Sequence, residues 1–119
     1  GGGDFITFNQ DISGWDVGNV TDMSYMFYAA TSFEQNLNSW NTSNVTNMDG
    51  MFTATIFESG IEEWDVSNVT NMLAMFFDAS SFNQDLSSWG VNGVTNCESF
   101  NYNTTAWTLP KPNFTNCTE

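Results

Sequence analysis

The sequence contains one phrase three times and the beginning of the same phrase a fourth time. The stretch WDVSNVTNMLAMF at residues 64–76 returns almost unchanged as WNTSNVTNMDGMF at 40–52 and WDVGNVTDMSYMF at 15–27, and WGVNGVTNCESF follows at 89–100. A unit of about 25 residues cannot bury an apolar face by itself, so successive units must stack on one another. A catalytic site needs to be built only once. We therefore interpret the recurring phrase as the description of a scaffold.

Apolar residues stay in register along most of the chain. Alignment on tryptophan gives steps of 25, 24 and 25 residues, and five further columns keep the same register. The columns are Trp15, Trp40, Trp64, Trp89; Phe8, Phe33, Phe57, Phe82, followed by Trp107; Ile12, Leu37, Ile61, Leu86; Val20, Val45, Val69, Val94; Met23, Met48, Met72, Cys97; and Met26, Met51, Met75, Phe100. The methionines could bind copper or form an adaptable groove, but identical columns are typical of a stacked core.

Within each unit the spacing predicts one short strand and one short helical arc. Residues 86–91 and their equivalents read as extended, and pairs such as Asn92-Gly93 suit a tight corner. The segment VTNMLAMF then places apolar residues at relative positions 0, 3, 6 and 7, which suits a helical or 3-10 turn. We therefore expect an α/β fold, a right-handed coil with a narrow parallel sheet along one side. A single domain, 1–119, would hold coils at about 5–29, 30–53, 54–78 and 79–100 and a C-terminal cap at 101–119.

The repeated pattern resembles a known family. FNQDLSSW-x-V-SNVT-x-M-x-x-MF-x-x-A-x-SF, which covers roughly Phe5 to Phe100, is similar to the BspA-like leucine-rich repeats of surface proteins. The resemblance implies a solenoid of the leucine-rich-repeat type. It also implies a secreted or cell-surface protein that acts in adhesion and interaction. That family has no shared catalytic residues, so no catalytic role is carried over.

Charge and composition narrow the classes of function. The chain has 14 acidic residues and one basic residue, Lys111, and its net charge is −13. Nucleic acids and anionic membrane surfaces are bound by basic residues, so neither is an expected partner, and no apolar run is long enough to insert into a membrane. Without His or Arg, His-based triads and His-ligated zinc cannot be built. We expect no enzymatic activity and no cofactor.

Two polar columns raise the question of calcium. They are Asp11, Asn36, Gly60, Asp85 and Asp16, Asn41, Asp65, Gly90. Aligned oxygen ligands could hold Ca²⁺, which takes six to eight oxygens. A glycine interrupts each column, however, and Asp and Asn also cap local turns by bonding the nearby backbone. We therefore predict no metal site, with calcium as the alternative reading.

The chain is rich in N-glycosylation motifs. Seven sequons occur, at Asn19, Asn41, Asn44, Asn68, Asn103, Asn113 and Asn116. Three of them (Asn19, Asn44, Asn68) share one repeat position, where the motif can arise simply because Val and Thr follow a corner asparagine. The three in the tail are better placed to accept a glycan, if the source is a eukaryote.

Cys97 and Cys117 are the only cysteines. Cys97 stands in a methionine column, and Cys117 ends the divergent tail. We predict a disulfide between them rather than two buried thiols, because the last coil of an extracellular stack needs to be sealed. The protein is accordingly expected outside the cell or at its surface.

The beginning of the chain offers a candidate surface for self-association. After Gly1-Gly2-Gly3 the sequence is already in repeat register, whereas the end of a stack normally carries a polar cap. Either upstream sequence is missing or another molecule covers this end. The residues concerned are Phe5, Ile6, Phe8, Ile12 and Trp15. We therefore predict a structural or adhesive module that assembles head-to-tail into a filament. The alternative is a monomeric recognition domain that binds a protein or carbohydrate on its sheet face.

Overall fold

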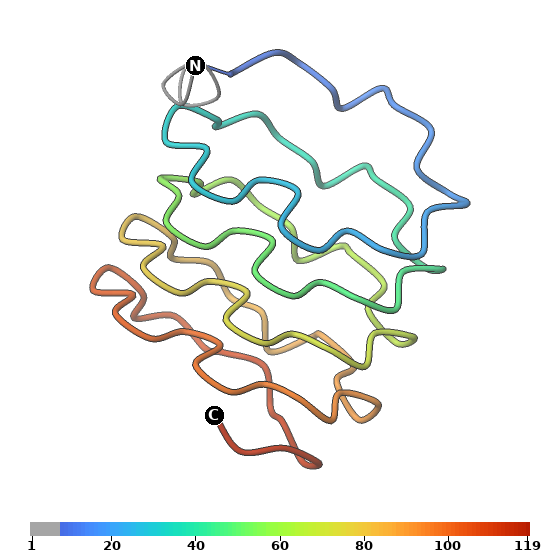
Figure 1. Ribbon diagram of the computed structural model, residues 1–119, viewed down its shortest axis with the longest axis vertical. Helices are drawn as coiled ribbons and strands as arrows, with labels where there is room; N and C mark the ends of the chain where they lie inside the picture. The colour runs from blue at the N-terminus through green and yellow to red at the C-terminus, as the bar shows by residue number, and fades with distance from the viewer. Residues whose placement is uncertain (1–7) are drawn as a thin grey trace.

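The chain winds back and forth in loops that stack on one another. The computed structural model describes residues 8–119 and measures 39 × 32 × 24 Å along its principal axes. Figure 1 shows the loops following one another from the blue end to the red end. We call them layer 1 (8–29), layer 2 (30–54), layer 3 (55–78) and layer 4 (79–103), and we call residues 104–119 the tail.

The α/β solenoid expected from the sequence is wrong. Residues 8–119 form no helix and no strand. Their only β-type pairing consists of three isolated parallel bridges, Asp22 with Asn47, Asn47 with Asn71, and Asn71 with Asn96. The layers are built from turns, so neither the expected helical arcs nor the expected narrow sheet is present.

Alternate backbone N–H groups point in two directions, and this explains the missing helices and strands. In layer 1 every second N–H closes a turn within the layer, as when Tyr28 donates to the carbonyl of Tyr25 at 3.1 Å. The N–H groups between them reach the next layer. These cross-layer bonds are Met23 to Asn47 (2.9 Å), Tyr25 to Asp49 (2.8 Å), Phe27 to Met51 (3.0 Å) and Ala29 to Thr53 (2.8 Å). Layers 2 and 3 repeat the pattern, so the backbone donors of this half of layers 1 to 3 are satisfied.

Left-handed residues recur at two fixed positions in every layer. One position holds Tyr25, Gly50, Ala74 and Ser99, and the other holds Ala29, Ala54, Asp78 and Asn103, with φ between 53° and 63°. A helix of L-residues requires a continuous right-handed backbone, so a left-handed residue every four positions prevents one. Such a conformation costs a non-glycine residue about 1–3 kcal/mol and persists where the surroundings determine it. In layers 1 to 3 the N–H of each of these residues donates a cross-layer hydrogen bond, which fixes its conformation.

The core consists of aromatic rows that run through the layers. One row is Phe8, Phe33, Phe57, Phe82, with neighbouring centroids 5.6–6.2 Å apart. A second is Phe27, Phe52, Phe76, at 5.4–5.5 Å. A third is Trp40, Trp64, Trp89, at 6.4 Å. Offset stacks of this kind add about 0.5–1.5 kcal/mol per pair beyond burial. Met48, Met51, Met72 and Met75 are fully buried beside them, which places these methionines in the core.

Each buried tryptophan also bonds the layer before it. The Nε1 of Trp64 donates to the carbonyl of Leu37 at 2.8 Å, and Trp40 and Trp89 make the equivalent bonds to Ile12 and Ile61. Trp15 occupies the same column but is 55% exposed. Within one column, tryptophan therefore occurs both in a buried stack, as Trp64, and at an exposed position, as Trp15.

This comparison gives a stability prediction. Trp64→Ala should lower the free energy of unfolding by about 3–5 kcal/mol, because it removes two ring stacks and leaves a cavity. Trp15→Ala should change it by less than about 1 kcal/mol, as is usual for an exposed site. Urea unfolding followed by circular dichroism measures both. Equal losses for the two variants would contradict the stacked core.

Candidate functional site

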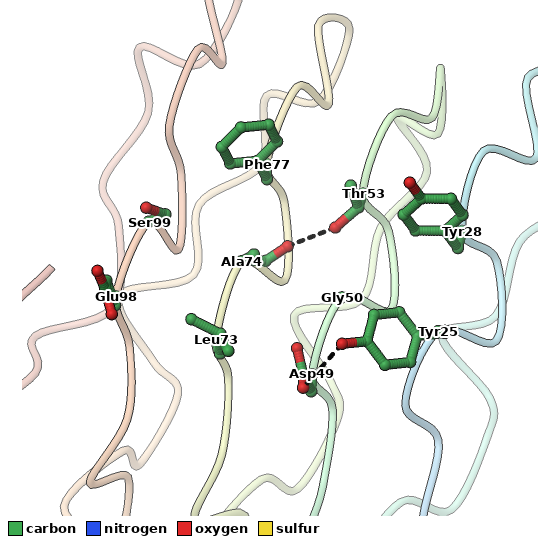
Figure 2. A pocket seen from close by; sticks show the side chains of 10 residues that line it. All are labelled: Tyr25, Tyr28, Asp49, Gly50, Thr53, Leu73, Ala74, Phe77, Glu98 and Ser99. Atoms are coloured by element: carbon green, nitrogen blue, oxygen red, sulfur yellow. Dashed lines mark hydrogen bonds between the residues drawn. The ribbon is translucent and has the colours of Figure 1, made fainter.

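A groove crosses the outer surface of the layers on the side of their left-handed turns. It has a volume of about 360 Å³ and is shown in Figure 2. We call it the aromatic–acidic groove. It is lined by Tyr25, Tyr28, Asp49, Gly50, Thr53, Leu73, Ala74, Phe77, Glu98 and Ser99.

The groove exists because a smaller residue follows a tyrosine in two columns that lie side by side. Tyr25 is followed in its column by Gly50, Ala74 and Ser99. Thr53 stands between Tyr28 and Phe77 in the neighbouring column. Layer 1 therefore supplies a raised aromatic wall, and layers 2 to 4 supply the lower floor beside it.

Tyr25 is fixed at the wall by its neighbours in layer 2. Its hydroxyl donates a hydrogen bond to Oδ2 of Asp49 at 3.1 Å. A Cβ added at Gly50 would lie 2.5 Å from Cε1 of Tyr25, so only glycine allows the ring to lie this close to the backbone. The Asp49 hydrogen bond and the nearby negative charge of Asp49 raise the pKa of Tyr25, which keeps its hydroxyl protonated.

The other lining residues complete an aromatic and acidic surface. Tyr28 meets Tyr25 edge to face with centroids 6.1 Å apart, and it is 53% exposed. Across the groove, Phe77 stacks on Tyr102 at 5.2 Å. Glu98 is exposed at the rim, and neither it nor Asp49 has a basic residue among the lining side chains. The groove can therefore offer ring faces and negative charge to a ligand.

Sequence reasoning missed this groove. The available signal was the change of residue size within two columns. Gly50 stands where the preceding repeat has Tyr25, and Thr53 stands where it has Tyr28. The signal becomes meaningful only when the two columns are known to lie side by side.

The residues predicted for self-association have different environments. Ile12 is buried at 3% exposure, Phe8 is partly buried against Phe33, and Trp15 is 55% exposed. Phe5 and Ile6 lie outside the described residues. Of the predicted set, Trp15 is the large apolar side chain that layer 1 exposes.

The opposite end of the stack is covered by the tail. A disulfide joins Cys97 to Cys117. Phe114 packs on Phe100 at 4.9 Å, and Trp107 packs on Phe82 at 4.8 Å, below the first phenylalanine row. The tail thus seals the core at this end.

The aspartates of the two polar columns serve local turns. Oδ1 of Asp65 accepts from the N–H of Ser67 (3.0 Å) and from its hydroxyl (2.6 Å), and Asp11 and Asp85 are bonded likewise by Ser13 and Ser87. These bonds lower the pKa of each carboxyl. No group of three or more His, Cys, Asp or Glu side chains that could hold a metal ion occurs between residues 8 and 119. The hydrogen bonds at Asp11, Asp65 and Asp85 fit the turn-capping interpretation, and the absence of a metal site stays a prediction.

The sequons fall into two groups. The side-chain amides of Asn44, Asn68 and Asn116 donate to backbone carbonyls of the layer before, and that of Asn103 donates to Asp78. The amides of Asn19, Asn41 and Asn113 donate no hydrogen bond within residues 8–119, and all three residues are exposed. A glycan is attached to this amide nitrogen, so the second group is the better placed to carry one. This differs from the prediction that the tail sites as a group are favoured.

The fold and the groove describe a protein built from stacked turns, with an aromatic and acidic groove on its surface. The family model described as "Mycoplasma protein of unknown function, DUF285" matches residues 3–58 and 37–117, so the chain belongs to this family. The match replaces the resemblance to BspA-like leucine-rich repeats, which was wrong. No curated protein and no solved structure matches the chain. No helix within residues 8–119 is long and apolar enough to span a membrane.

The sealed end yields a second prediction. The disulfide closes a loop with a sequence separation of 20 residues, so replacing both cysteines by alanine should lower the free energy of unfolding by about 3 kcal/mol. Thermal and urea unfolding would measure the loss. Reductant should destabilise the native chain and leave the double variant unchanged, and a native chain indifferent to reductant would contradict the role of the bridge.

Proposed function

We propose that the protein is an extracellular or cell-surface recognition module that binds a partner in its aromatic–acidic groove. The observation that carries the proposal is the pair of exposed tyrosines on the groove wall. Tyr25 and Tyr28 are each more than half exposed although they lie beside an apolar core. Tyrosine is enriched at binding hot spots because it offers a large apolar ring with a polar tip.

The groove is organised before any partner arrives. Asp49 and Gly50 hold the Tyr25 ring, so little rotamer freedom remains to be lost on binding. Each ordered side chain otherwise costs an interface about 0.5–1.5 kcal/mol. A rigid wall of this kind favours a site used for binding.

Composition supports a binding role over catalysis. The chain lacks His and Arg, and the groove holds two carboxylates without a partnered base or nucleophile. The disulfide supports a location outside the cytosol. The net charge of −13 disfavours nucleic acid as the partner.

The proposal predicts ligand binding that depends on the groove tyrosines. On an array of short peptides and glycans, the native protein should bind a subset of probes. Tyr28→Ser should weaken that binding at least about tenfold, as expected for loss of a hot-spot residue. Leu109→Ser is the matched control, because Leu109 is a similarly exposed apolar residue (42%) that does not line the groove. Equal effects of the two substitutions would refute the proposed site.

Self-association is a second candidate function, favoured by the groups that layer 1 leaves exposed within residues 8–119. Met26 is 38% exposed, whereas Met51, Met75 and Phe100 in the same column are fully buried. The carbonyls of Asp22, Ser24, Met26 and Tyr28 accept no hydrogen bond from residues 8–119. Their equivalents in layer 2 accept the bonds that join layer 1 to layer 2. A second molecule that adds to this face would make a structural or adhesive filament.

The head-to-tail form of this candidate needs a donor edge at the other end. The N–H groups of Cys97, Ser99, Asn101 and Asn103 donate to no acceptor within residues 8–119. These N–H groups are donors, so in a second copy they could form hydrogen bonds with the carbonyls of layer 1. The tail covers the core beside them, so the carbonyls of layer 1 would meet this edge and the apolar side chains of layer 1 would meet the tail.

Sedimentation velocity tests the second candidate. If layer 1 is an interface, the native protein should show concentration-dependent association in the micromolar range. The double variant Trp15→Ser, Met26→Ser should be monomeric, because it removes the exposed apolar side chains. Ile56→Ser changes an exposed apolar residue elsewhere and should associate like the native chain. A native protein that stays monomeric would remove the filament and leave the recognition module.

A further inference from the structure

Resting on the proposed function, we infer that the groove accepts a positively charged side chain, that of a lysine or arginine projecting from a protein partner. The inference combines three properties of the lining residues. These are unopposed negative charge, exposed ring faces, and a volume that admits an extended side chain.

The negative charge of the groove has no internal counterpart. Asp49 and Glu98 line it, and no basic residue does. The chain's single basic residue, Lys111, belongs to the tail, where its Nζ lies 5.2 Å from the ring centroid of Trp107 and 3.4 Å from the Trp107 carbonyl. A ligand cation therefore competes with no cation of the protein. The net charge of −13 attracts it from a distance.

Asp49 has one oxygen available for a ligand. Its Oδ2 accepts the Tyr25 hydroxyl, while its Oδ1 accepts no hydrogen bond from residues 8–119. An ammonium or guanidinium group in the groove can donate to Oδ1 without displacing Tyr25. The carboxylate would then hold both the wall and the ligand.

The aromatic wall recognises the same charge. The rings of Tyr25 and Tyr28 stand at 70° to one another, so they offer surfaces of different orientation above the floor. A lysine or arginine cation within about 6 Å of a ring centroid gains about 0.5–2 kcal/mol from the ring quadrupole. The alkyl stem of such a side chain also packs well on apolar surface, as that of Leu73 here.

The dimensions and the charge together select among ligands. Small-molecule pockets begin at about 300 Å³, and the groove, at about 360 Å³, is near that limit. It is therefore large enough to admit an extended side chain. An anion would be repelled by both carboxylates. A neutral sugar could stack on the tyrosines but would leave the negative charge unused.

Fluorescence anisotropy with matched peptides tests the inference. The probe is a labelled Gly-Ser peptide with two lysines and one arginine at its centre. The comparison peptide carries acetyl-lysine and citrulline at those positions, which removes the charge and keeps the length. The charged peptide should bind at least about tenfold more tightly, within the range expected for cation–π and ion-pair contacts combined. Its affinity should fall as salt rises.

Isosteric variants locate the binding. Asp49→Asn and Glu98→Gln should each weaken binding of the charged peptide several-fold and leave the neutral peptide unaffected. Asp85→Asn makes the same charge change outside the groove, at a column position where Asn36 is already asparagine, and should alter the affinity less than about twofold. Circular dichroism melts verify that all variants fold.

The outcomes separate this inference from the proposed function. Equal binding of the charged and neutral peptides would overturn the cationic ligand, as would equal effects of Asp49→Asn and Asp85→Asn. A neutral peptide or glycan that binds and is sensitive to Tyr28→Ser would keep the recognition function and refute the cation. If no probe binds in a manner sensitive to Tyr28→Ser, both proposals fall.

Discussion

The division of backbone N–H groups between two directions is the constraint on which the structure depends. A chain that packs phenylalanine and methionine rows in its interior must still satisfy its peptide groups, because each buried orphan costs about 1–3 kcal/mol. A helix would satisfy them within the segment and leave nothing to join the layers. Here alternate N–H groups close local turns while the others bind the next layer. No buried side-chain polar atom within residues 8–119 lacks a hydrogen-bond partner, so the buried polar side chains are satisfied as well.

Register between layers follows from this constraint and makes each sequence column a physical row. Cross-layer backbone bonds connect residues 23 to 26 apart, close to the length of one repeat, so equivalent side chains stand above one another. The threonine column shows the effect, because Thr46 and Thr70 each donate through their N–H and hydroxyl to the threonine of the preceding layer. Where the same residue type continues, the row reinforces the scaffold. Where the residue type changes abruptly, as from Tyr25 to Gly50, the difference in side-chain size forms the groove.

The sequence predicted the phenylalanine row that begins at Phe8, the tryptophan row from Trp40 to Trp89 and the pairing of Cys97 with Cys117. It did not predict the row that begins at Phe27, and it misassigned the local backbone. Apolar residues at relative positions 0, 3, 6 and 7 fit a helical turn and a succession of three-residue turns equally well. The distinguishing feature is the left-handed backbone at Tyr25, Ala29 and Ala54. Tyrosine and alanine have no local preference for that conformation, so only the cross-layer bonds reveal it. The groove was unpredictable for a related reason, since it depends on two columns lying next to each other.

The distribution of acidic residues explains how a uniformly negative protein can still have one selective site. The Oδ1 atoms of Asp11, Asp65 and Asp85 each accept a hydrogen bond from a serine two residues later in the same turn. The lowered pKa of each carboxyl keeps it ionised. They add to the long-range field but stand on open surface, where single charges are strongly screened. Asp49 instead stands beside ring faces in a groove that excludes part of the solvent, and there a pair of opposite charges interacts more strongly. The field of the whole molecule thus brings cations near, and the contrast between Tyr25 and Gly50 decides where one of them is held.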